Sequence, residues 1–199
     1  MKPIILASTS PRRKELLSMI GIKFKAVDSC YREDLNYELK PFALARYLSR
    51  GKAEKAAKKY KDHIIIAADT FVVSGKSLMG KPNSAAEARK MLKKISGAIL
   101  YVVTGFTVTD TGSGKTLSKA VTTKVYIKNL TDTEINNYIK TKEPLGKAGA
   151  FAIQGFGALI VKKIEGDFFN VMGLPLNALA DALKKFGIEI IGKKRDSEK

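Results

Sequence analysis

The sequence is poor in residues that form disulfides and transition-metal sites: it has one cysteine, Cys30, one histidine, His63, and no tryptophan. A single cysteine excludes an intramolecular disulfide and multi-cysteine zinc sites, and a single histidine excludes paired-histidine metal motifs. A Ser-His-Asp triad with His63 stays open, but no G-x-S-x-G motif accompanies it, and a histidine directly before residues 64–66 favours a strand edge. Any metal should therefore be a hard cation held by carboxylates and water.

Long apolar runs are also missing. No stretch approaches the roughly 18 apolar residues of a membrane span, and the apolar run at residues 3–7 is too short for a signal-peptide core. We therefore expect a cytoplasmic protein without membrane contact. The 199 residues suffice to bury a core. Without repeats or composition breaks, we expect one domain over residues 1–192 and a charged tail over residues 193–199.

Acidic residues are scarce beside basic ones. Asp and Glu total 19 against 36 Lys and Arg, which gives a formal net charge of +17. This surplus favours polyanionic partners. Charge alone does not separate nucleic acid, a nucleotide and a solvated lysine-rich surface.

Hydrophobic periodicity and turn residues predict alternating strands and helices. Strands are expected over residues 3–7, 64–68, 71–73, 99–110 and 116–128, the last two joined as a hairpin. Helices are expected over residues 10–20, 41–59 and 84–95, from residue 131, and from residue 176 to near 187. Ser84 with Glu87, and Thr131 with Glu134, fit capping boxes. The order predicts an α/β fold with a mixed sheet.

Two glycine-rich stretches come close to the phosphate-binding P-loop and fail. In GKSLMGKP at residues 75–82, Pro82 stands where Ser or Thr must reach magnesium. In GSGKT at residues 112–116, the first glycine of the motif is replaced by Thr109, and a strand pattern follows. Neither stretch supports a P-loop NTPase.

The segment STSPRRKELL at residues 8–17 begins a helix but carries two arginines in the first turn. Ser10 is a favourable N-cap and Pro11 fits the first helical position. Arg12 and Arg13 add positive charge where the helix end is already positive, at a cost of about 0.3–1 kcal/mol each. The arrangement is explained if the helix N–H groups and both guanidinium groups bind a phosphate. A surface arginine pair is the alternative.

Two further stretches contain residues that could take part in catalysis or in ligand binding. In AADT at residues 67–70, Asp69 should lie at the carboxyl end of a strand, where ligands of α/β proteins collect. There it can accept a proton from water or hold a divalent cation, with a structural N-cap as the alternative. In EPLGKAGAFAIQG at residues 143–155, Gln154 offers a paired donor and acceptor for a base edge. A surface glutamine among turn glycines is the alternative.

The quoted motifs occur in the order ILASTSPRRKELL, IIIAADTFVV, GKPNSAAEARKMLKKISG, VVTGFTV and EPLGKAGAFAIQGFGALIVKKIEGDFFNVMGLPL. In this order, over nearly the whole chain, the sequence resembles the Maf family, septum-formation proteins that act as nucleoside triphosphate pyrophosphatases. The resemblance implies a Maf/ITPase-like fold: an elongated mixed β-sheet flanked by helices, with two lobes around a central cleft.

The resemblance also implies roles for individual residues. Asp69 would be the proton acceptor and, with Glu33, would bind a divalent cation (Mg, Mn or Co). The residues expected to bind substrate are Arg12, Arg13, Glu33, Lys52, Thr70, Lys81, Lys147 and Gln154. Thr70 and Gln154, with Arg12, match the branch that acts on dTTP and UTP. Gly146 replaces the Asp that the family usually has before Lys147.

The implied activity is hydrolysis of dTTP and UTP, extending to modified pyrimidine triphosphates, to the nucleoside monophosphate and pyrophosphate. A house-cleaning role, a part in cell-division arrest and a homodimer accompany it, and nucleic acid is not an expected partner. The alternative function is a basic nucleic-acid-binding regulator of cell division, which would show steeply salt-dependent affinity. A phosphatase that releases orthophosphate would differ only in the bond that breaks.

Overall fold

A computed structural model describes residues 2–32 and 39–191 of the chain. Glu33 and the tail at residues 193–199, both part of our sequence-based predictions, lie outside the described residues. The strands are β1 (Ile4–Ala7), β2 (Lys25–Val27), β3 (Ile64–Ser74), β4 (Ser77–Met79), β5 (Ile99–Asp110), β6 (Thr116–Ile127) and β7 (Val161–Glu165). They form one sheet in the order β2-β1-β3-β5-β6-β7, with β4 paired to β3.

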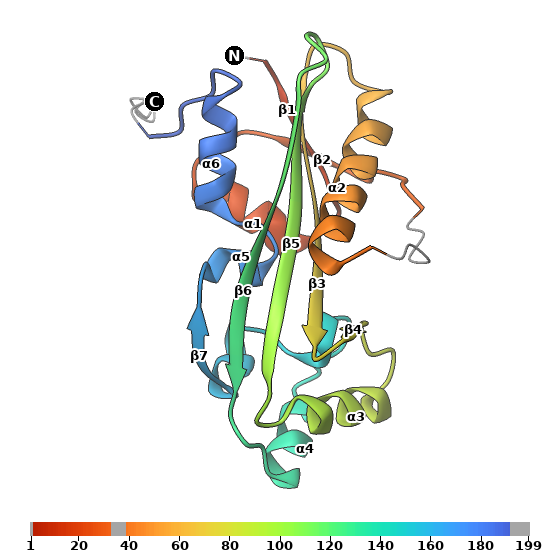
Figure 1. Ribbon diagram of the computed structural model, residues 1–199, viewed down its shortest axis with the longest axis vertical. Helices are drawn as coiled ribbons and strands as arrows, with labels where there is room; N and C mark the ends of the chain where they lie inside the picture. The colour runs from red at the N-terminus through yellow and green to blue at the C-terminus, as the bar shows by residue number, and fades with distance from the viewer. Residues whose placement is uncertain (1, 33–38, 192–199) are drawn as a thin grey trace.

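The sheet is mixed and elongated, as predicted. β1 pairs in parallel with β2 and β3, and the remaining pairs are antiparallel. The long strands β3, β5 and β6 run along the long axis of the molecule (Figure 1). The predicted hairpin of β5 and β6 is confirmed, with Thr109 paired to Thr116 beside the turn.

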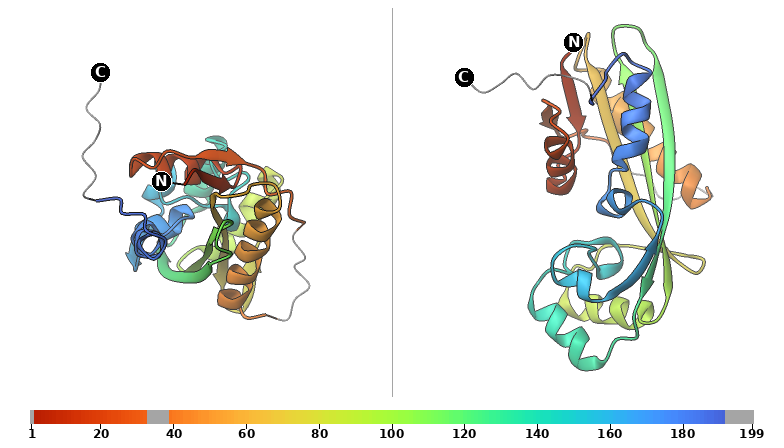
Figure 2. Two further views of the ribbon diagram at one scale, coloured as in Figure 1. Left: turned by 90° about the horizontal axis from the view of Figure 1, so that it is seen from above. Right: turned by 90° about the vertical axis from the view of Figure 1, so that its left-hand side faces the viewer.

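Helices lie on both faces of the sheet (Figure 2). They are α1 (Pro11–Met19), α2 (Pro41–Ala57), α3 (Ala85–Ile95), α4 (Asp132–Lys140), α5 (Phe168–Met172) and α6 (Leu176–Lys184), with 3-10 turns η1 (Ala148–Ala150) and η2 (Gly155–Leu159). α2 covers one face, α1, α5 and α6 lie on the other, and α3 and α4 lie at the far end of the sheet. None of the described helices combines the length and apolar character that crossing a membrane requires.

The core divides along the two faces of β3. Ala67 packs in the cluster beneath α2, whereas Ile66 packs in the larger cluster that includes Leu16 of α1. Because strand side chains alternate between faces, Asp69 projects toward α2 and Thr70 projects toward α1 and α5. Two adjacent polar residues therefore serve opposite sides of the sheet.

The prediction of two separate strands at residues 64–68 and 71–73 is wrong, because a single strand, β3, covers both. β3 continues through Asp69 to Ser74 because β5 pairs with it along its whole length, from Ile64 opposite Asp110 to Ser74 opposite Leu100. The strand that ends near Asp69 is β1, whose Leu6 pairs with Ile66 and whose last residue is Ala7. Asp69 thus lies beside the carboxyl end of β1 and in the middle of its own strand.

Helix capping follows the sequence signals in part. Thr131 and Glu134 form the predicted capping box of α4. At α3, Ser84 accepts from the N–H of Glu87 at 3.1 Å, but the Glu87 carboxylate binds the N–H of Asn83 at 2.7 Å. The predicted side-chain cap at Ser10 does not form.

Gly105 allows α2 to lie directly against β5. A Cβ at this position would be 2.1 Å from the carbonyl oxygen of Ala45 and 2.6 Å from the amide nitrogen of Arg46. Gly105 is also the strand partner of Asp69. The absence of a side chain on β5 therefore sets how closely α2 approaches the sheet beside this carboxylate.

Gly105→Ala should destabilise the protein by about 1–3 kcal/mol, because the added methyl group meets helix backbone that cannot move cheaply. Urea denaturation measures the change. Gly80→Ala is the matched control, since its Cβ would have no heavy atom within 4 Å, and it should stay within about 0.5 kcal/mol of wild type. Equal midpoints for wild type and Gly105→Ala would contradict this account of the α2 packing.

Candidate active site

A cleft of about 1100 Å³ opens beside β3, between α1, α2 and the segment at residues 145–153. Seven of the residues predicted to form the site line it: Arg12, Arg13, Lys52, Asp69, Thr70, Lys81 and Lys147. Gln154 is half-buried and is not among the lining residues, although its neighbour Ile153 is. The position of Glu33 is outside the described residues.

The cleft lies where one edge of β3 is open. Since β5 occupies one side of β3 along its whole length, β1 and β4 share the other side. β1 pairs with β3 as far as Ile66 and β4 pairs from Val72. In the described part of the chain, no strand covers residues 68–71 on that side. Backbone groups there need partners from side chains or ligands.

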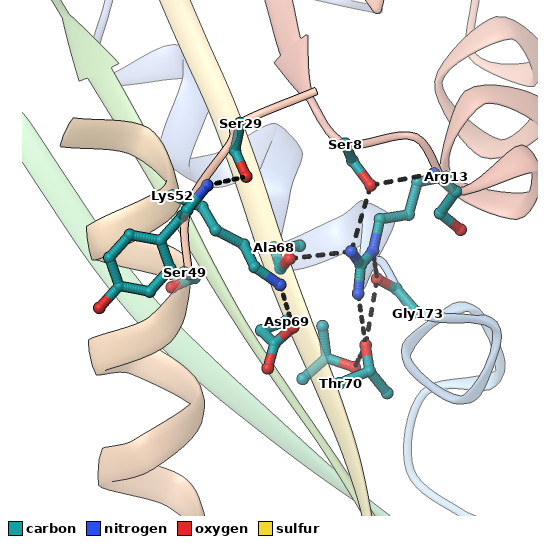
Figure 3. Close-up of polar contacts among 12 residues, drawn as sticks. Ser8, Arg13, Ser29, Ser49, Lys52, Ala68, Asp69, Thr70 and Gly173 are labelled. Carbon is teal, nitrogen blue, oxygen red and sulfur yellow. Dashed lines mark hydrogen bonds and ion pairs between the residues drawn. The ribbon is translucent and has the colours of Figure 1, made fainter. Parts of the chain in front are cut away.

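Lys52 and Asp69 form a buried ion pair at the base of the cleft (Figure 3). Lys52 lies on the face of α2 that also buries Leu48 and Ala56, and its ammonium group donates to Oδ1 of Asp69. The two side chains are only 11% and 10% exposed. Loss of one member of such a pair leaves an uncompensated charge at a cost of about 3–5 kcal/mol. The pair therefore fixes the position of both groups at the base of the cleft.

Arg13 ties three segments together around the open edge of β3 (Figure 3). Its Nη1 donates to the carbonyl oxygen of Ala68 at 2.8 Å and to Oγ of Ser8 at 3.3 Å. Its Nη2 donates to Oγ1 of Thr70 at 3.0 Å, and its Nε to the carbonyl oxygen of Gly173 at 2.9 Å. Much of its hydrogen-bonding capacity thus goes to the protein, although the side chain also lines the cleft.

The N-terminus of α1 faces this cleft without a side-chain cap. Ser10 makes no capping bond, and its own N–H donates to Oγ of Ser8 at 3.2 Å. Pro11 and Arg12, in the first helical turn, both line the cleft. The N–H groups of a first turn and the helix dipole favour an anion. The helix end and Arg12 therefore suit a phosphate group.

Lys147, in the wall segment at residues 145–153, supplies a second cationic group near Arg12. Burial lowers the pKa of the Lys147 ammonium from its ordinary value, and the positive charge of Arg12 lowers it further, while Glu143 acts in the opposite direction. The ammonium group donates to the carbonyl oxygen of Glu143. Lys81, which is exposed, adds a third charge at the rim. The cleft thus concentrates positive charge where an anionic ligand would neutralise it.

Glu143 organises the wall segment from inside, a role that the sequence did not indicate. Its Oε1 accepts from the hydroxyl of Tyr138 at 3.0 Å and the N–H of Gly157 at 2.9 Å, and its Oε2 accepts from the N–H of Phe156 at 3.0 Å. Burial, and then the Glu143 carboxylate, raise the pKa of Tyr138 well above its usual range. Tyr138 therefore stays protonated and accepts from the N–H of Ala152 at 3.2 Å.

Sequence reasoning also missed parts of the lining. Ser8 and Gly173 supply oxygen atoms to Arg13, and their roles depend on contacts across the fold. The apolar half of the cleft is lined by Val72, Met79, Phe151 and Ile153 among others. Gly146, where the family resemblance implies an Asp, has a positive φ of 69°, and a Cβ at this position would have no neighbouring heavy atom within 4 Å. A side chain there would have space, but its backbone would be strained in this conformation.

The carboxylates of the cleft bear on metal binding. Among the described residues, no three His, Cys, Asp or Glu side chains gather into a metal-binding group. The described carboxylates that line the cleft are Asp28 and Asp69. Magnesium in nucleotide enzymes is held by one or two carboxylates together with phosphates and water. This donor set fits a cation that binds together with a triphosphate.

Comparison with known proteins gives consistent matches. A family model described as Maf-like protein matches residues 3–186. The dTTP/UTP pyrophosphatase of Methanosarcina barkeri is 48% identical over 191 residues, 96% of this chain and 97% of that protein. The dTTP/UTP pyrophosphatase of Thermoanaerobacter pseudethanolicus is 50% identical over 183 residues, 92% and 95% of the two chains. Among solved structures, the Staphylococcus aureus Ham1 protein matches with a TM-score of 0.45 and 19% identity, over 64% of this chain and 73% of that chain.

Glu143→Gln should lower the free energy of unfolding by about 1–3 kcal/mol. The carboxylate of Glu143 accepts three hydrogen bonds, and the NH₂ group of glutamine would face at least one of those three donors without accepting from it. Urea denaturation measures the loss. Glu189→Gln, on an exposed position, removes a negative charge without these contacts and should leave stability unchanged. If both variants unfold at the wild-type midpoint, Glu143 does not organise the wall.

Proposed function

Since this chain belongs to the Maf family, we propose that it hydrolyses dTTP and UTP to the nucleoside monophosphate and pyrophosphate. Two relatives of nearly full coverage carry that activity in their names. The observation that carries the proposal is a single cleft that combines a buried carboxylate, Asp69, with cationic groups from separate elements. This is the combination that nucleophilic attack on a phosphoanhydride requires.

We assign the phosphate chain to the cationic part of the cleft. A nucleoside triphosphate brings about four negative charges, which Arg12, Lys81 and Lys147 at the walls can neutralise. The uncapped N–H groups of α1 add donors at the same end. Arg13 supports this end through Ser8 and Ala68 and adds its own charge.

We assign Asp69 as the proton acceptor. Its carboxylate takes a proton from a water molecule as the water oxygen bonds to the α-phosphorus and the bond from that phosphorus to the bridging oxygen breaks. Pyrophosphate leaves with the electron pair of that bond, and the water oxygen stays in the nucleoside monophosphate. The ammonium of Lys52 donates to Oδ1 of Asp69 and holds the carboxylate in place.

A divalent cation, which the family resemblance implies, would be held by Asp69 together with phosphate oxygens and water, with Asp28 as the other described carboxylate of the cleft. When bound, it neutralises charge on the phosphates. The share of Glu33 in this binding is part of the sequence-based proposal.

We assign the base to the apolar half of the cleft. Val72, Met79 and Phe151 line this part, and Thr70, which also lines the cleft, lies between Asp69 and Val72 along β3. Gln154, directly after Ile153, would read the base edge if its amide turns toward the cleft. The cleft volume of about 1100 Å³ leaves room for a substituted base, so we include modified pyrimidine triphosphates among the substrates.

The wild-type protein with magnesium and dTTP or UTP should release pyrophosphate and no orthophosphate, and ¹⁸O from water should appear in the monophosphate. Asp69→Asn should lower turnover by about 10²–10⁴-fold, because an amide cannot accept the proton. Asp181→Asn, exposed on α6, is the matched control and should keep wild-type turnover. Orthophosphate as the product would refute the reaction, and near-normal turnover of Asp69→Asn would remove Asp69 from it.

The lowered pKa of Lys147 predicts an alkaline limit on substrate capture. Above that pKa the ammonium loses its charge, so kcat/KM should begin to fall below pH 10.5, the ordinary lysine value. Lys147→Arg, which stays charged, should move this limb to higher pH. Lys140→Arg, on an exposed position of α4, should leave the profile in place. An unchanged limb in Lys147→Arg would show that the charge of Lys147 does not hold the substrate.

A further inference from the structure

A chain of hydrogen bonds runs from the hydroxyl of Thr70 on β3 through that of its strand partner Thr104 on β5 to the backbone of Asn170 on α5. Thr70 Oγ1 lies 3.0 Å from Nη2 of Arg13 on one side and 3.0 Å from Oγ1 of Thr104 on the other. Thr104 Oγ1 in turn lies 3.0 Å from the carbonyl oxygen of Asn170. Thr104 comes from β5 and is fully buried, so its hydroxyl must find its partners within the protein.

The two ends of the chain determine the direction of its hydrogen bonds. Arg13 can only donate, and the carbonyl oxygen of Asn170 can only accept. Thr104 therefore donates its single hydroxyl proton to Asn170 and accepts from Thr70. Thr70 donates to Thr104 and accepts from Arg13.

The opposite direction is less favourable by distance. Thr104 would donate to Thr70, and Thr70 would have to donate to the carbonyl oxygen of Gly173 at 3.5 Å, beyond the usual range for a hydroxyl donor. That arrangement replaces two contacts of 3.0 Å by one good contact and one long one. Burial of Thr104 and Asn170 strengthens the difference.

The far end of the chain is held rigidly. Asn170 is fully buried, and its Nδ2 donates to the carbonyl oxygen of Val102 and to Oγ1 of Thr123, both at 3.0 Å. Asp167 caps α5 by accepting from the N–H groups of Phe169 and Asn170. The acceptor that fixes Thr104 therefore cannot turn away.

This direction commits the only proton of Thr70 to the protein. A hydroxyl has one proton and two lone pairs. Thr70 donates its proton to Thr104 and accepts from Arg13 with one lone pair. No other donor among the described residues binds its second lone pair. Thr70 lines the cleft. Toward a ligand it can therefore act as an acceptor only.

We propose that Thr104 is a positioning residue for base selection: by taking the proton of Thr70, it makes Thr70 an acceptor that favours a ring carrying a proton at N3. The inference rests on the proposed function. Uracil and thymine carry that proton, whereas cytosine has a bare lone pair at N3 that would face the lone pair of Thr70. Thr70 lines the cleft next to Val72, the next residue on the same face of β3, and Val72 pairs with Met79 of β4 in the part of the cleft to which we assign the base.

The test compares kcat/KM for UTP and CTP by pyrophosphate release. Thr104→Val removes the acceptor but keeps the shape, so Thr70 regains a proton that it can donate to cytosine N3. The UTP/CTP ratio should fall by about tenfold, the worth of one hydrogen bond of this kind. Thr104→Ser keeps the hydroxyl and should keep the wild-type ratio. Thr104→Ala gives the same readout if the valine variant folds poorly.

A double-mutant cycle separates positioning from general damage. If Thr104 acts through Thr70, Thr104→Val should have no further effect on the ratio in a Thr70→Val background. Equal losses for UTP and CTP in Thr104→Val, or a further fall of the ratio in the double variant, would overturn the inference. So would a wild-type enzyme that uses both nucleotides equally well. A wild type that releases no pyrophosphate from either nucleotide would instead refute the proposed function.

Discussion

The buried ion pair of Lys52 and Asp69 is the interaction on which the cleft depends. It joins α2 to the central strand, and Gly105, the strand partner of Asp69, lets α2 lie close against β5 at this point. A larger residue on β5 would separate the two charges and leave each of them buried. The packing of α2 and the position of the ion pair are thus one constraint, set by a glycine that is not among the residues lining the cleft.

The second constraint is the interrupted edge of β3. The pairing of β1 with β3 ends at Ile66 and the pairing of β4 with β3 begins at Val72, so the edge of the central strand between them is open to the cleft. Arg13 donates to the carbonyl oxygen of Ala68 at this edge and, through Thr70, connects the cleft to the buried hydroxyl chain that ends at Asn170. The polar groups that line the cleft are therefore connected by hydrogen bonds to the interior of the sheet.

Sequence patterns predicted the elements that have strong local signals. The β5–β6 hairpin and the capping box of Thr131 are confirmed, because alternation and capping act over a few residues. The short strands β2 and β7 and the five-residue helix α5 were not predicted, since each is too short to show a period and is stabilised by its neighbours. Asp69 was expected at the end of its own strand, a mistake that only the pairing with β5 corrects.

The sequence by itself determined the class of fold, the basic character of the chain and the residues with chemistry to offer, since these follow from composition, period and motif. Tertiary structure decided which of them meet. It paired Lys52 with Asp69 and used much of the hydrogen-bonding capacity of Arg13 within the protein. It also left Gln154 outside the cleft lining and placed Thr104 within hydrogen-bond distance of Thr70. The reason is physical: such contacts join residues far apart in the chain, and their partners are chosen by how strands register and how closely helices can approach.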